Sequence, residues 1–135
     1  MQTISFHGYR AEFDRSATRN WYASAEEWGC ECAHCRNFLA LAKKKALPES
    51  VMCILNELGI PSEKATYVGE LYTDEKGVHY QFSYRLAGTI LAEPKEPEAE
   101  GRWCHEPYPY GAPGFPEPHF DLEFWETLPW ILDEK

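Results

Sequence analysis

The sequence lacks the features by which many membrane-spanning, secreted and nucleotide-binding proteins are identified. It has no apolar run close to the about 18 residues that cross a bilayer, and no basic segment followed by an apolar one at its start. Gly-rich phosphate loops, the Gly-x-Ser-x-Gly elbow of acyl hydrolases and the His-Glu-x-x-His motif of metalloproteases are also absent. We therefore expect a cytoplasmic protein outside these common enzyme classes.

Basic residues are scarce. There are 13 Lys and Arg against 22 Asp and Glu, which gives a net charge of -9. Such a charge repels phosphate backbones and anionic lipid surfaces, so nucleic acids and membranes are poor partners. A protein, a cation or a neutral small molecule is compatible with it. The simplest alternative is that the charge serves solubility alone.

The length and the aromatic content indicate one folded core. The chain has 135 residues, of which 15% are aromatic, so it has the size of one domain and many large rings to bury. We expect residues 1–135 to form a single α+β domain. Its parts are a mostly antiparallel sheet, two consecutive helices on one face and an extended arm rich in proline and aromatic residues.

Alternation of apolar and polar residues predicts five strands. Residues 3–13 contain two of them on either side of a bend at Gly8, residues 65–72 and 78–86 form a hairpin, and residues 119–126 form the last. In the second strand of the hairpin the even-numbered positions carry most of the rings. We expect that face to pack on the second of the two helices.

The two helices are predicted in the middle of the chain. Residues 37–46 have helical apolar spacing and end in lysines, which complement the helix dipole. Pro48 then suits the first position of a second helix that runs to Leu58 and is closed by Gly59.

Two other patterns have simpler interpretations. Residues 15–28 show no periodicity, apart from the spacing of a capping box that begins at Ser24 and could start one helical turn. Acidic residues alternate along the predicted strands and are interpreted as facing solvent: Glu12, Asp14, Asp121 and Glu123.

The arm is predicted at residues 94–118, where seven of the ten prolines and three glycines exclude a regular helix or a central strand. A flexible linker rarely carries many rings, so we expect the arm to lie over the domain. Trp103, Tyr108 and Tyr110 are the residues that it would offer to a partner.

Three of the five cysteines fall within six residues, as Cys30-x-Cys32-x-x-Cys35. In a reducing compartment such clusters indicate metal or redox chemistry rather than disulfides. In an extended segment Cys30 and Cys32 point the same way, and a tight turn can bring Cys35 back to them. Zinc is the expected metal, and it needs a fourth ligand or a water besides three thiolates.

Several residues are candidates for that fourth ligand. Cys104 and His105 come first, because the arm that carries them could fold back over the cluster. His79 comes second, on the strand face opposite to the rings. Cys53 is a weaker candidate because it falls on the polar face of the second helix.

Two alternatives to a metal site remain. The three thiols could be reduced residues packed in a turn, which is common for free cysteine. Cys32-x-x-Cys35 also has the spacing of a redox pair near a helix N-terminus, although the βαβ pattern around a thioredoxin-type site is missing.

The segment from Cys30 to Arg36 resembles the zinc-binding segment of the glutathione-dependent formaldehyde-activating enzymes. The preceding Gly-x-Cys-x-Cys-Gly element and the following Cys-x-x-Cys of that family are absent. Two helices are also expected here where the family continues in strands. The resemblance implies a zinc role for Cys30, Cys32 and Cys35 and says nothing about catalysis.

A longer similarity, over residues 28–86, is to a family of small bacterial proteins. They share a C-x-C-x-x-C-x-Asn-Phe segment, a Leu-Pro pair and a helix that ends in Leu-Gly-Ile, which correspond here to residues 30–38, 47–48 and 58–60. This similarity implies a bacterial, cytoplasmic protein. It supports the fold more than any activity.

These observations favour a small binding or accessory protein that zinc stabilises and that presents the aromatic arm to a partner. The second hypothesis is a thiol or zinc enzyme that acts on a small molecule. The third, based on net charge alone, is an acidic inhibitor of a basic protein.

Overall fold

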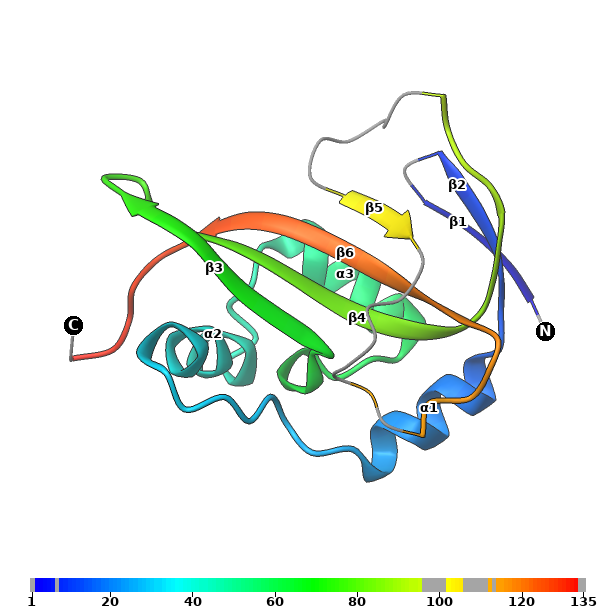
Figure 1. The fold of residues 1–135 in the computed structure, drawn as a ribbon, viewed down its shortest axis with the longest axis horizontal. Coiled ribbons are helices and arrows are strands. Elements are labelled where there is room, and N and C mark those ends of the chain that lie inside the picture. The colour runs from blue at the N-terminus through cyan, green and yellow to red at the C-terminus, as the bar shows by residue number, and fades with distance from the viewer. Residues whose placement is uncertain (1, 7, 96–101, 106–111, 113, 134–135) are drawn as a thin grey trace.

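The fold is described from a computed structural model, which covers residues 2–6, 8–95, 102–105, 112 and 114–133. Within these residues, six antiparallel strands form one sheet in the order β1-β2-β4-β6-β5, and β3 also pairs with β4 (Figure 1). The strands are β1 (Gln2–Phe6), β2 (Tyr9–Phe13), β3 (Tyr67–Asp74), β4 (Gly77–Ala92), β5 (Arg102–His105) and β6 (His119–Leu128). The five predicted strands are confirmed, and β5 is an additional one.

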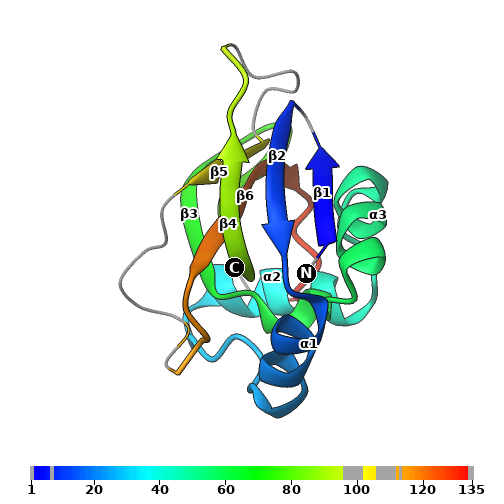
Figure 2. The ribbon, with the colours of Figure 1, turned by 90° about the vertical axis from the view of Figure 1, so that its right-hand side faces the viewer.

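The described part of the chain also contains three α-helices and one short 3-10 helix. They are α1 (Arg15–Ser24), α2 (Ala33–Lys43), α3 (Glu49–Leu58) and η1 (Ser62–Lys64). Figures 1 and 2 show α3 on one face of the sheet and α1 at one end of it. The predicted α+β class is therefore confirmed. None of the described helices is both long and apolar enough to cross a membrane.

The core lies between the ring-bearing face of β4 and the helices. Phe82 is fully buried, and its ring centroid lies 4.9 Å from that of Phe38 in α2. The ring of Tyr80 also contacts Phe38, at 5.8 Å. These ring contacts are with the first of the two predicted helices, whereas the sequence predicted the second. From α3, Leu55 and Leu58 are buried in the same core.

A buried amide explains why α2 lies against the sheet. Asn37 is fully buried, and its Nδ2 donates to Tyr80 Oη at 3.3 Å and to Pro129 O at 3.1 Å. Its Oδ1 accepts from the backbone N–H of Ile131 at 2.8 Å. One side chain therefore joins α2 to β4 and to the segment that follows β6, because a buried amide must find partners for its donors and its acceptor.

Helix α1 corrects the prediction for residues 15–28, where at most one helical turn was expected to start at Ser24. Ser24 is instead the last residue of α1, and Asp14 caps its start by accepting from Ala17 N at 3.0 Å. The helix covers a stretch of the β4 edge between β3 and β2. There Tyr22 Oη donates to Arg85 O at 2.8 Å, and Ala87 N donates to Thr18 Oγ1 at 3.0 Å.

The second predicted helix is confirmed nearly to the residue. Pro48, the predicted first residue, is the N-cap of α3, so the helix begins one residue later, at Glu49. Gly59 ends the helix in the left-handed conformation at φ 75°, where a glycine meets no Cβ penalty.

Parts of the arm lie on the domain. Strand β5 pairs with β6, and Ala112 and Phe115 are buried. The ring of Phe115 packs 4.9 Å from that of Trp21. Of the expected partner-binding residues, Tyr108 and Tyr110 lie outside the described residues, as does the side chain of Trp103.

The interpretation of the acidic strand residues is half wrong. Asp121 and Glu123 are buried, with exposures of 1% and 5%. Asp121 Oδ1 lies 3.0 Å from Arg85 Nε, and Gln81 donates a hydrogen bond to Glu123. The reason is that residues on both faces of β6 are buried from Phe120 to Phe124, and both carboxylates find polar partners on β4. Of the other two acidic residues, Asp14 is partly buried as the N-cap of α1, and Glu12 is exposed as expected.

Candidate metal centre

The three clustered cysteines converge at the start of α2. Their sulfur atoms all lie within 4.8 Å of one another, and Cys30 Sγ is 3.5 Å from Cys32 Sγ. A tetrahedral zinc site with Zn–S distances of about 2.3 Å places neighbouring sulfurs about 3.8 Å apart. Small side-chain movements would therefore close a three-thiolate site, and the predicted convergence is confirmed.

Local structure explains this convergence. Cys32 is the N-cap of α2, with extended backbone angles (φ -65°, ψ 156°), and its Sγ accepts from Cys35 N at 3.4 Å. The tight turn expected after Cys32 is the first turn of α2, which starts four residues before the predicted residue 37. That turn is anchored to β4, because Tyr80 Oη donates to His34 O at 2.6 Å.

The environments of the thiols differ. The backbone N–H of Cys35 stabilises a negative charge on the Cys32 sulfur and lowers the pKa of that thiol. Burial raises the pKa of Cys35 to about 12. Cys30 and Cys32 are exposed and Cys35 is buried, so a metal could reach the first two from solvent while the third lies at the base of the site.

Trp28 supplies an independent test of whether a thiolate fits. Its indole N–H is buried and finds no acceptor with hydrogen-bond geometry among the described residues. It lies beside the Cys35 thiol and, as a donor, counteracts the increase in the pKa of that thiol. A buried donor without a partner costs about 1–3 kcal/mol. A metal-bound thiolate at Cys35 would accept this hydrogen bond, so the site fits a metal ion.

Those candidates for a fourth ligand whose side chains are described do not join the cluster. Cys104 is buried in β5 opposite Leu122 of β6, and among the described residues the candidate group contains only the three clustered cysteines. The arm pairs with the sheet at the β6 edge, so Cys104 does not fold back as expected. The side chain of the neighbouring His105 lies outside the described residues.

The other two candidates are also elsewhere. The His79 side chain has a carboxylate and a hydroxyl as neighbours, since Nε2 lies 3.0 Å from Asp74 Oδ2 and Nδ1 lies 2.9 Å from Thr127 Oγ1. Cys53 is exposed on α3, as predicted.

The surface beside the cluster is open and acidic. A pocket of about 490 Å³ is bounded by Cys30, Trp28 and the side chains of Glu26, Glu31 and Arg36, among others. No described carboxylate comes close enough to join the three sulfurs as a ligand. A fourth ligand from solvent or from another molecule would have access from this side.

Comparisons with known proteins add no assignment: no family model, curated protein or solved structure matches the chain. The similarities to formaldehyde-activating enzymes and to the small bacterial family therefore stay predictions, and function has to be argued from the site.

Proposed function

We propose that the chain is a small cytoplasmic binding or accessory protein whose Cys30, Cys32 and Cys35 thiolates hold one zinc ion. The observation that carries this proposal is the convergence of three sulfurs within 4.8 Å. The unsatisfied indole N–H of Trp28 beside Cys35 supports it further. All five cysteines are free, which agrees with a compartment that keeps thiols reduced.

The role of the zinc would be structural. Residues 25–32 connect α1 to α2 without helix or strand. They are held by scattered contacts, among them the hydrogen bond from Trp28 N to Glu63 O at 3.0 Å and that from Arg36 Nε to Glu31 O at 2.9 Å. A zinc ion bound to Cys30, Cys32 and Cys35 would tie this connection to the first turn of α2. Zinc binding free energy of this kind contributes directly to folding.

The partner is proposed from the arm and the charge. Trp103, Tyr108 and Tyr110 are the aromatic residues that the arm would offer, and the net charge of -9 favours a basic or neutral partner over an anionic one. An inhibitor of a basic protein is a special case of this proposal.

A zinc enzyme is the second candidate, and one feature favours it. Three protein ligands with a fourth position left for water is the arrangement of catalytic zinc sites, whereas structural sites are closed by four protein ligands. The adjoining pocket would admit a small molecule. A thiol enzyme is the alternative form, because the 3.5 Å between the sulfurs of Cys30 and Cys32 also allows oxidation to a disulfide.

Metal analysis and thermal unfolding test the proposal. Protein purified without chelator should contain close to one zinc per chain, and a strong chelator should lower its melting temperature. Structural zinc contributes about 10–16 kcal/mol in small peptides, compared with a whole-domain stability of about 5–15 kcal/mol. Even a fraction of it would therefore produce a clear shift.

Serine variants provide the matched comparison. Cys30→Ser, Cys32→Ser and Cys35→Ser should each lose zinc and melt at lower temperature, whereas Cys53→Ser on the exposed side of α3 should change neither quantity. Metal-free protein whose stability is unaffected by the three substitutions would leave packed, reduced thiols as the explanation. Rapid oxidation of Cys32 by a low-molecular-weight disulfide in the zinc-loaded protein would favour the thiol enzyme.

A further inference from the structure

Two of the three clustered cysteines are placed to react with each other. Cys30 Sγ and Cys32 Sγ are 3.5 Å apart, and both residues are exposed. A disulfide bond is about 2.05 Å long, so the two sulfurs need to approach by about 1.5 Å to form one. The sequence alone indicates a different pair, Cys32 and Cys35, which has the C-x-x-C spacing of many redox sites.

Cys35 is held away from solvent and in a fixed position. It is 6% exposed and lies in the first turn of α2. That turn is anchored to β4, because Tyr80 Oη donates a hydrogen bond to His34 O at 2.6 Å. A reagent from solvent therefore reaches Cys30 and Cys32 but not Cys35, and the sulfur of Cys35 cannot approach another one without a movement of α2 on the sheet.

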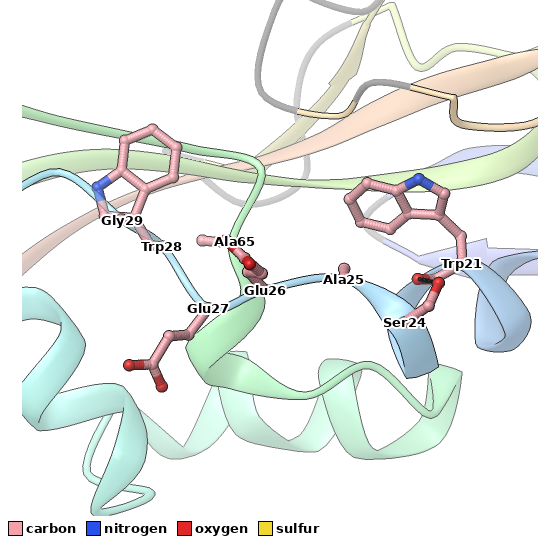
Figure 3. Close-up of a pocket in the computed structure, with 8 residues that line it drawn as sticks. All are labelled: Trp21, Ser24, Ala25, Glu26, Glu27, Trp28, Gly29 and Ala65. Atoms are coloured by element: carbon pink, nitrogen blue, oxygen red, sulfur yellow. Dashed lines mark hydrogen bonds between the residues drawn. The ribbon is translucent and has the colours of Figure 1, made fainter.

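The segment that carries Cys30 has room to adjust. Residues 26–29 border two pockets, with volumes of about 460 and 490 Å³. Figure 3 shows the first of them, which the connection passes along from Ser24 to Gly29. At Gly29 a Cβ would meet only Glu27 O, at 3.9 Å, among the described residues outside its chain neighbours. This space allows the sulfur of Cys30 to move the short distance to that of Cys32.

We propose that Cys30 and Cys32 form a reversible disulfide by exchange with a low-molecular-weight disulfide, while Cys35 stays reduced. In the first step one of the two thiolates attacks a sulfur of the reagent, forms a mixed disulfide and releases one reagent thiol. In the second step the other thiolate attacks the protein sulfur of that mixed disulfide and releases the second reagent thiol. Two electrons pass from the two cysteines to the reagent, and the two cysteine protons end on the released thiols.

Oxidation would act as a switch on the metal centre, and this consequence rests on the proposed function. The disulfide removes two of the three proposed zinc ligands, because a cysteine binds metal as a thiolate. Since only the reduced protein then binds zinc, zinc in turn opposes the oxidation. Exposed disulfides are commonly the labile, regulatory ones, so a reducing compartment would restore the site.

Equilibration in glutathione redox buffers tests the pair. The parent protein carries Cys53→Ser, which removes the exposed thiol of α3. As the proportion of oxidised glutathione rises, two thiols per chain should be lost, and differential alkylation with mass spectrometry should find Cys35 still reduced. Dithiothreitol should restore both thiols. Loss of Cys35 together with Cys32, or glutathione that stays attached to the protein, would overturn the proposal.

Serine variants in the same background separate the two possible pairs. Cys35→Ser should still form the intramolecular disulfide, whereas Cys30→Ser should form only a mixed disulfide between Cys32 and glutathione. An intramolecular disulfide that persists in Cys30→Ser would overturn the proposal. The mapping of reduced cysteines in the parent protein does not depend on whether these variants fold.

Zinc distinguishes this proposal from the proposed function. At free zinc about 100 times its dissociation constant, half-oxidation should require a ratio of oxidised glutathione to the square of reduced glutathione that is about 100-fold higher. Zinc should also be released in step with the loss of the two thiols. Protein that binds zinc but forms no disulfide, or whose midpoint zinc does not move, would refute the switch and leave the metal centre. A disulfide in protein that binds no zinc would support the redox pair and refute the metal centre.

Discussion

Replacing Asp121 with asparagine removes the negative charge that faces Arg85 within the sheet. The two side chains are 1% and 5% exposed, and Asp121 Oδ1 is 3.0 Å from Arg85 Nε. Unit charges about 4 Å apart attract by about 4 kcal/mol at an effective dielectric constant of about 20. Because the buried guanidinium would lose this attraction without regaining water, we expect Asp121→Asn to lower the free energy of unfolding by about 3–5 kcal/mol.

Urea denaturation of matched variants measures this loss. Glu12→Gln, which makes the same chemical change at an exposed position of β2, should alter the free energy of unfolding by less than about 0.5 kcal/mol. The double variant Arg85→Met with Asp121→Leu should recover much of the loss, because an apolar pair can replace a buried ion pair. Equal and small effects of Asp121→Asn and Glu12→Gln would show that the pair is not buried as described.

Three further predictions follow from packing, backbone and thiol chemistry. Phe82→Ala should lower the free energy of unfolding, measured by urea denaturation, by about 3–5 kcal/mol, whereas Leu71→Ala, at a residue that is 45% exposed, should lower it little. Similar losses in the two variants would contradict the burial of β4. Gly88→Ala should lower the free energy of unfolding by about 4 kcal/mol or more, because φ is +146° and a Cβ would lie 1.9 Å from Glu12 O. Gly114→Ala, with φ +75° and open space around it, should lower it by only about 1–2 kcal/mol. A tolerated Gly88→Ala would contradict the β2–β4 pairing. In metal-free protein the alkylation rate of Cys32 should reach its midpoint at a pH below about 8.5, the pKa of a free cysteine, because the pKa of Cys32 is lowered. Cys35 should stay unreactive at that pH, because its pKa is raised to about 12. Mass spectrometry that finds Cys35 modified first would reverse this assignment.

The elements with strong apolar periodicity could be predicted from the sequence. Helix α3 has Val51, Leu55 and Leu58 on one face and Gly59 at its end, so both its course and its stop are visible. Helix α1 was not predicted because the residues that it buries include Thr18 and Tyr22, whose hydroxyl groups bond to β4. Polar residues with a tertiary partner look like surface residues in the sequence.

The same limit applies to the acidic residues of β6. Asp121 and Glu123 alternate with Phe120 and Leu122, which is the pattern of a strand with one solvated face. In the structure both faces are covered, and Arg85, which is distant in the sequence, provides the partner. Period-two alternation identifies which residues share a face but not what covers that face.

The candidate site, like the fold, could be predicted only in part from the sequence. The convergence of Cys30, Cys32 and Cys35 could be predicted because it depends on local geometry alone. The place of Cys104 could not be predicted, because it depends on which strand β5 pairs with. A pocket of about 460 Å³ that Trp21 and Trp28 line could not be predicted either, because the two residues belong to different local structures and border one space only when the connection between α1 and α2 is placed.

X-ray absorption spectroscopy at the zinc edge tests the metal-centre proposal most directly. We expect three sulfur scatterers at about 2.3 Å and one lighter oxygen or nitrogen scatterer, with the spectrum unchanged in Cys104→Ser and in Cys53→Ser. Four sulfur scatterers would mean that another cysteine completes the site and would contradict the open fourth position. Protein that takes up no zinc, or that binds it through oxygen and nitrogen alone, would contradict the three-thiolate centre itself.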